Sequence, residues 1–188
     1  MKRMLLTVLL VSLCAMGSTA AKKVYRRQIV KEFSVGARPE LALSNRFGEI
    51  RIVEGADRKI TVRVELRGEG KTDEEARRYA EAVNVDLSLS GNRVEGRTTF
   101  QKIICNNCGR AADFTVTAPR DVVLSLANQF GNIYINRATQ PLTVTVKYGD
   151  LYLKEASTAS VNVSFGKASI DRCAMLNLNS QYSSITLG

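Results

Sequence analysis

The chain has 188 residues, with 27 lysine and arginine residues against 18 aspartate and glutamate residues, and it contains no histidine or tryptophan. Without histidine, the chain lacks a Ser-His-Asp or Cys-His catalytic system and cannot bind zinc through imidazole. Acid–base catalysis would depend on carboxylates, lysine or tyrosine. The length suits one domain, or one domain with a sub-domain, that buries a substantial core.

Residues 1–20 have the pattern of a secretory signal peptide. Lys2 and Arg3 precede an uncharged apolar run over residues 4–16, and small residues follow. As a helix this run is about 20 Å long, shorter than the ~30 Å hydrocarbon core of a membrane. A lipoprotein alternative would use Cys14, but Leu13 stands where that processing prefers a small residue. We expect an exported protein, in the periplasm or at the cell surface, with no transmembrane segment in the mature chain.

Removal of residues 1–20 leaves 25 basic and 18 acidic residues. Because the protein is expected to be exported, we expect no nucleic-acid partner. Anionic glycans, lipopolysaccharide or membrane headgroups suit a basic surface better, although a charge of this size also serves solubility alone.

Five segments align on an aromatic residue that is followed by a small one: Phe47-Gly48, Phe130-Gly131, Tyr148-Gly149, Phe165-Gly166 and Tyr182-Ser183. The last four aromatic residues are spaced 18, 17 and 17 residues apart. Apolar residues occupy the positions six and four before the aromatic residue, and three and five after it, in every copy. The residues between these columns are mostly polar, and this period of two is typical of β-strands.

Each copy is therefore predicted to be strand, tight turn and strand, with glycine providing a positive φ or a close approach. A unit of this size buries its apolar face only by stacking on copies of itself. The sequence predicts an all-β fold, a parallel β-solenoid (β-helix or β-roll) of ~17-residue rungs, with one helix-containing insert between the first rung and the others. The alternative is an antiparallel sandwich of hairpins, which requires no such constant spacing.

Three segments are expected: the signal peptide at 1–20, a first rung with a strand-helix-strand insert at 21–120, and β-solenoid repeats at 121–188. The last segment holds only 5 basic and 4 acidic residues. In the insert, residues 60–66, 85–89, 93–104 and 114–118 alternate as strands. Thr72 and Glu75 form a capping box that starts a helix predicted over 73–84, and the acidic residues of its first turn suit the helix dipole.

The cysteine pair in Cys105-Asn-Asn-Cys108 lies between two predicted strands. A local disulfide, free or conditionally oxidised thiols, a metal site and a redox site all remain open. Only Cys173 could add a further thiolate ligand in the mature chain, so we expect no metal and no cofactor. Cys173 is expected to be a small buried residue.

With the rungs laid out, the chain resembles the bacterial putative-adhesin family of β-solenoid domains, and is similar to autotransporter-adhesin-like head domains. The resemblance covers residues 30–188 and is carried by residues 41–52, by Phe130-Gly-Asn-Ile-Tyr-Ile135 and by Tyr148-Gly-Asp-Leu-Tyr-Leu153. It implies a cell-envelope location and an adhesin-like binding or structural role. The family has no catalytic motif to transfer, so no catalytic residue is predicted.

Three functions follow as alternatives: an exported, non-enzymatic adhesin-like module, a periplasmic partner in envelope-stress signalling, and a β-helical polysaccharide-active enzyme. The last needs two carboxylates in one groove, and the repeats place none together. The expected partner is a glycan or an envelope protein. Tyr134 and Tyr152 share an outward column and are candidate ligand contacts through stacking on sugar rings, or ordinary cross-strand pairs. The final rung is predicted to expose unpaired backbone. Either the chain is a truncated version of a longer protein or another chain covers that end, and an end-to-end homodimer is a hypothesis on this ground.

Overall fold

The computed structural model describes residues 22–56, 58–104 and 108–188. The predicted signal peptide at 1–20 lies outside the described residues. The predicted division of the remaining chain near residue 120 stays a prediction. No helix in the described part of the chain is long and apolar enough to cross a membrane.

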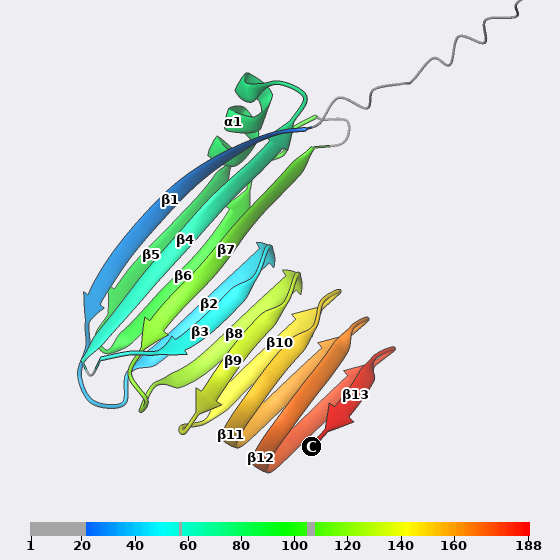
Figure 1. Ribbon diagram of the computed structural model, residues 1–188. Helices are drawn as coiled ribbons and strands as arrows, with labels where there is room; N and C mark the ends of the chain where they lie inside the picture. The colour runs from blue at the N-terminus through cyan, green and yellow to red at the C-terminus, as the bar shows by residue number, and fades with distance from the viewer. Residues whose placement is uncertain (1–21, 57, 105–107) are drawn as a thin grey trace, which may run out of the picture.

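Thirteen strands and one helix make up the described structure (Figure 1). The strands are β1 (Lys23–Ser34), β2 (Glu40–Phe47), β3 (Ile50–Glu54), β4 (Lys59–Gly70), β5 (Val83–Ser90), β6 (Arg93–Phe100), β7 (Gly109–Ala118), β8 (Val123–Phe130), β9 (Ile133–Ala138), β10 (Leu142–Lys147), β11 (Leu151–Ser164), β12 (Lys167–Gln181) and β13 (Ser184–Leu187). Helix α1 (Asp73–Glu81) lies between β4 and β5 in the chain.

The strands form one mixed sheet that folds back on itself into a nearly closed barrel. One layer runs β1-β4-β7-β3-β9 and the other runs β5-β6-β2-β8-β10. The long strand β11 joins the layers, because residues 151–156 pair with β9 and residues 159–164 pair with β10. At the far side, Lys31 of β1 donates a hydrogen bond to the Leu87 carbonyl of β5 at 2.7 Å.

The prediction of an all-β fold is confirmed, but the parallel β-solenoid is wrong. Antiparallel pairs between β1 and β4, β4 and β7, and β5 and β6 are integral to the sheet. The predicted insert does not stand apart from the stack, because β4 and β7 extend one layer and β5 and β6 extend the other. Alternation in a sequence shows which side chains share a face, but not which strand is the neighbour or in which direction it runs.

Columns of the sequence alignment correspond to rows of cross-strand partners in the parallel part of the sheet. One row contains Leu41, Leu124, Leu142, Ala159 and Leu176. A second row, in the opposite layer, contains Ile50, Ile133, Leu151, Ala168 and Ile185. These rows point inward, and all of their members except Leu176 and Ile185 are buried. The core therefore runs continuously between the two layers.

In the aromatic turns, the residue with positive φ is either the glycine or the aromatic residue before it. Gly48 and Gly131 have φ of 111° and 138°, whereas Tyr148 takes this role itself with φ of 55°. The turns stack closely, and a Cβ atom on Gly131 would lie 2.0 Å from the Gly48 carbonyl oxygen. Glycine at this turn thus serves both of the purposes expected of it, positive φ and close approach.

Helix α1 begins with the predicted cap, in which the Thr72 hydroxyl accepts a hydrogen bond from Glu75 N at 3.1 Å. The helix ends at Glu81, three residues before the predicted end, because Val83 already begins β5. The helix packs on β4 at Gly68, where a Cβ would lie 2.1 Å from the Ala76 carbonyl oxygen.

Candidate functional site

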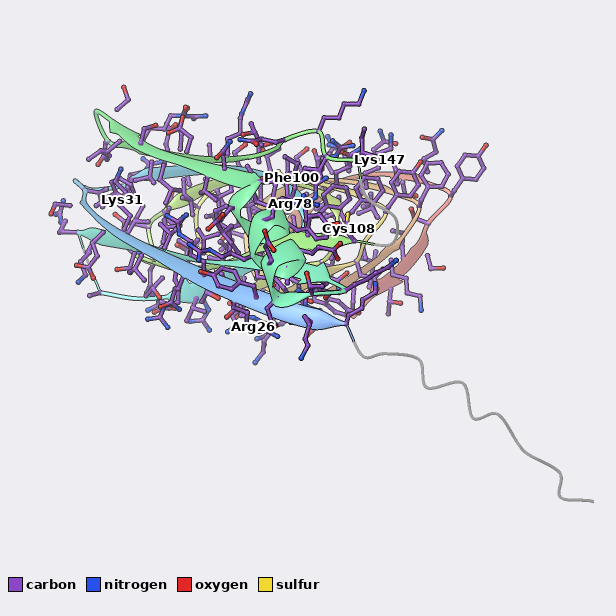
Figure 2. All side chains as sticks on the ribbon, turned by 90° about the horizontal axis from the view of Figure 1, so that it is seen from above. Arg26, Lys31, Arg78, Phe100, Cys108 and Lys147 are labelled. Carbon is purple, nitrogen blue, oxygen red and sulfur yellow. The ribbon has the colours of Figure 1, made fainter. Side chains whose placement is uncertain are left out.

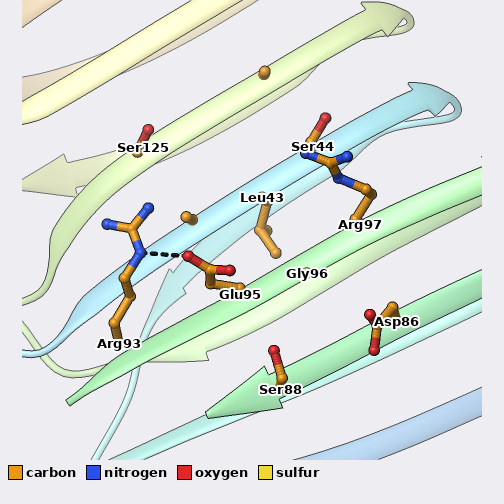
Figure 3. Close-up of a pocket in the computed structure, with 11 residues that line it drawn as sticks. Leu43, Ser44, Asp86, Ser88, Arg93, Glu95, Gly96, Arg97 and Ser125 are labelled. Atoms are coloured by element: carbon orange, nitrogen blue, oxygen red, sulfur yellow. Dashed lines mark hydrogen bonds and ion pairs between the residues drawn. The ribbon is translucent and has the colours of Figure 1, made fainter. Parts of the chain in front are cut away.

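A shallow groove of about 450 Å³ crosses β8, β2, β6 and β5 on the outer face of one layer (Figure 3). Its floor is made of outward-facing small side chains from β2 and β8, namely Ala42, Ser44, Ser125 and Ala127. These residues alternate with buried leucines along each strand, so the sheet's pleat places all four on one surface. The floor therefore carries hydroxyl groups and methyl groups but no charge.

The wall of the groove on β6 is charged. Arg93 donates hydrogen bonds to Glu95 at 2.6 Å and to Glu40 at 2.7 Å. These bonds, with Glu95 the larger cause, raise the pKa of the Arg93 guanidinium above its ordinary value. Arg93 is therefore already committed to carboxylates of the chain itself.

Arg97 differs from Arg93, because its guanidinium forms no ion pair or hydrogen bond within the described residues. It lies between Ser44 of β2 and Asp86 of β5, its cross-strand partners. In Figure 3 its side chain reaches over Ser44 toward the floor of the groove. The groove thus presents an exposed guanidinium beside hydroxyl groups, which can bind a carboxylate or sulfate group through charge-assisted hydrogen bonds.

A stripe of stacked aromatic rings runs along the turns at one end of the parallel strands. Successive ring centroids from Phe47 through Phe130, Tyr148 and Phe165 to Tyr182 are 4.9–5.2 Å apart. Adjacent rings are nearly parallel, so the ring faces cover one another and mainly the edges face solvent. At the other end of the stripe, Phe100 meets Phe47 edge to face at 5.0 Å.

Basic side chains accompany this aromatic stripe. Arg46 lies over Phe47 at 5.1 Å from the ring centroid, and Lys147 lies over Tyr148 at 5.4 Å. Figure 2 labels Phe100, which borders this stripe, and Lys147. The stacked rings stabilise the turns, and the basic side chains beside them lie partly exposed over the ring faces.

The predicted ligand contacts Tyr134 and Tyr152 do lie together, with centroids 5.0 Å apart and planes at 4°. The Arg51 guanidinium lies 4.2 Å from the Tyr134 centroid, so both faces of that ring are covered. Tyr152 has the small residue Ser169 as its next cross-strand partner, and the nearby Asp150 carboxylate raises the pKa of its phenol. A role in stacking on sugars stays a prediction, and only Tyr152 offers a ring face for it.

Of the cysteines, the structure describes Cys108 and Cys173. Cys108 is disulfide-bonded, but Cys105 lies outside the described residues, so their pairing stays a prediction. Cys173 is half-buried rather than fully buried, and its thiol donates to the Met175 carbonyl at 3.2 Å. Within the described residues, no group of three or more potential ligands could hold a metal ion.

Sequence reasoning did not identify Arg97 or the groove. The useful signal was present in the outward columns three and five before the aromatic residue, where every copy has a small or uncharged polar residue. What could not be read from the sequence was the position of β6, which pairs with β2 and raises a charged wall beside this neutral surface.

No protein-family model matches the chain, and no curated protein matches its sequence. Among solved structures, the chain is similar to a putative cell adhesion protein from Clostridium sporogenes, with a TM-score of 0.52 and 9% identity over 87% of this chain and 99% of that one. A putative adhesin from Bacteroides fragilis has a TM-score of 0.38 and 13% identity over 86% of this chain and 96% of that one. The first of these structures shares the fold of this chain.

Proposed function

We propose that this protein is an exported, non-enzymatic binding protein of the cell envelope with an adhesin-like role. The observation that carries this proposal is the groove, in which Arg97 forms no ion pair with the described residues and lies between Ser44 of the neutral floor and Asp86. Asp86 is the cross-strand partner of Arg97, but no ion pair joins Arg97 to any of the described residues, so its guanidinium is open to an anionic partner. The signal-peptide pattern supports export, and the shared fold agrees with this role.

The chemistry of the groove favours an anionic glycan. Ser44 and Ser125 hydroxyls can exchange hydrogen bonds with sugar hydroxyls, and Arg97 can bind a uronate carboxylate in a bidentate manner. Because the floor is flat and continuous along neighbouring strands, it can accommodate an extended polymer rather than a small enclosed ligand. Binding of this kind is expected to weaken with salt.

Replacing Arg97 by glutamine is expected to weaken binding of polygalacturonate, a polyuronate, about tenfold or more, because a charge-assisted hydrogen bond is lost. Isothermal titration calorimetry on the folded chain measures this effect. Arg63→Gln is the matched control, since Arg63 is also exposed on a strand and forms no ion pair with the described residues. An equal loss in both variants would show that only net charge attracts the polymer.

Protease shaving of intact cells tests the cellular location. The tagged protein is expected to be digested while a periplasmic control protein survives, because an adhesin must reach the outside of the cell. Protection of the protein together with its release in the periplasmic fraction would rule out adhesion. That result would instead favour the second candidate, a periplasmic partner in envelope-stress signalling, to be sought by crosslinking.

The enzymatic alternative can be tested at the same groove, because Asp86 and Glu95 both line it. Glu95 is held by a hydrogen bond from Arg93, and both residues are exposed to solvent on an open face of the sheet. Prolonged incubation with polygalacturonate is therefore expected to release no reducing ends and no unsaturated product. Product formation that Asp86→Asn abolishes would contradict the non-enzymatic proposal.

A further inference from the structure

The outer edge formed by β12 and β13 is the least protected part of the sheet. In this edge, Met175 and Leu187 are 67% and 58% exposed, although both are large apolar residues. Leu176, Leu178 and Ile185 pack against the core but are only partly buried. In Figure 1 these strands lie at the end of the sheet opposite helix α1.

Residues 174–188, which form this edge, contain no charged residue and no proline. Natural proteins usually block sheet edges with charges, proline, bulges or a covering element, because an exposed edge pairs readily with another strand. None of the described residues covers this edge. It therefore combines apolar side chains with backbone groups that are open to a further strand.

The other edges of the sheet are protected. Strand β1 carries five charged residues, namely Lys23, Arg26, Arg27, Lys31 and Glu32. Helix α1 packs beside it, and Lys31 bridges to the Leu87 carbonyl of the opposite edge strand, β5. The contrast between the ends of one sheet indicates that the open edge is an interface.

We propose that the edge of β12 and β13 binds a second copy of this chain. Two copies with an excess of basic residues repel each other over most of their surface, and the 174–188 edge, which has no charged side chain, lets them approach without contact between basic side chains. The exposed segment of β12 and strand β13 lie in opposite layers of the barrel. A second copy can be related to the first by a 180° rotation about an axis that lies in the plane of the contact and runs along the strands. The exposed segment of β12 in one copy then lies beside β13 of the other copy, and the two strands run antiparallel.

The aromatic stripe supports a second copy of the chain as the partner at this edge. Tyr182 stacks on Phe165 at 5.2 Å on one side, and it is 78% exposed. When the rotation axis passes near the turn between β12 and β13, the Tyr182 rings of the two copies come face to face. The aromatic stripe then continues into the second copy. The interface then combines two pairs of strands, partly buried leucines and a central aromatic contact.

Sedimentation equilibrium of the purified chain, with residues 1–20 removed, tests the proposal. We expect a dimer at micromolar concentrations, and we expect Met175→Lys combined with Leu187→Lys to raise the dissociation constant at least about a hundredfold. The matched control is Val24→Lys combined with Val30→Lys, because these residues are 49% and 50% exposed on the protected strand β1. The control should remain dimeric.

A photo-crosslinking residue at position 182 gives a second measurement that does not require destabilising variants. It is expected to yield a covalent dimer, whereas the same residue at position 24 should not. A monomer at several hundred micromolar overturns the proposal and leaves the edge open to a strand of another protein. A dimer that Met175→Lys with Leu187→Lys does not weaken, in chains whose circular dichroism is unchanged, also overturns it.

Discussion

Replacing Gly131 by alanine is expected to lower the free energy of unfolding by about 4 kcal/mol, with roughly equal contributions from backbone strain and overpacking. Gly131 has a φ of 138°, a conformation that L-residues rarely adopt. A Cβ atom would also lie 2.0 Å from the Gly48 carbonyl oxygen. That oxygen cannot retreat easily, because it accepts a hydrogen bond from the Asn128 side chain at 2.7 Å.

Gly91→Ala is the matched control for this substitution. Gly91 also has a positive φ, of 58°, but nothing lies within 4 Å of its Cβ position. Its replacement is therefore expected to cost only about 1 kcal/mol, the price of the left-handed conformation alone. Urea denaturation of both variants separates the two costs. Equal destabilisation would show that the stacked turns move apart freely, contrary to the close contact between Gly131 and Gly48.

Much of the fold was accessible from the sequence because β-structure leaves a period of two that local residues determine. The aligned columns correctly identified which residues share a row, including Leu41 and Leu124, which pair although 83 positions apart. The pairing of β4 with both β1 and β7 was not predictable in this way. Each of these strands occurs once, so no repeat indicates its neighbour, and direction is set by packing across the whole sheet.

The candidate site was less accessible for a related reason. A column of serine, alanine and threonine looks like an ordinary solvated face, and Arg97 looks like one of many arginines. Only the pairing of β6 with β2 places Arg97 beside Ser44. Tyr134 and Tyr152 were correctly placed on one face. Arg51 stands in the same column of the alignment, four residues after Phe47, so its position beside the Tyr134 ring could also have been read from the sequence.

Replacing Phe114 by alanine is expected to lower the free energy of unfolding by about 3–5 kcal/mol, because a large cavity opens in the core. Phe114 is 1% exposed and lies on β7, between Ile50 of β3 and Val64 of β4. The comparison variant is Phe165→Ala, which removes the same atoms from the partly exposed stripe. Its expected cost is about 1–2 kcal/mol, from lost ring contacts. Similar losses in the two variants would contradict the core position of Phe114.

The Phe114 ring also reaches the opposite layer, where its Cε1 atom lies 3.8 Å from the Cβ position of Gly96 on β6. A Cβ at Gly96 would meet Leu43 Cδ2 at 2.5 Å and Leu87 Cδ2 at 3.0 Å, so Gly96→Ala alone forces these leucines toward Phe114. In the Phe114→Ala background the leucines can move into the cavity, and Gly96→Ala should cost less. A double-mutant cycle is expected to give a coupling of about 1 kcal/mol or more, and strict additivity would show that the leucines relax elsewhere.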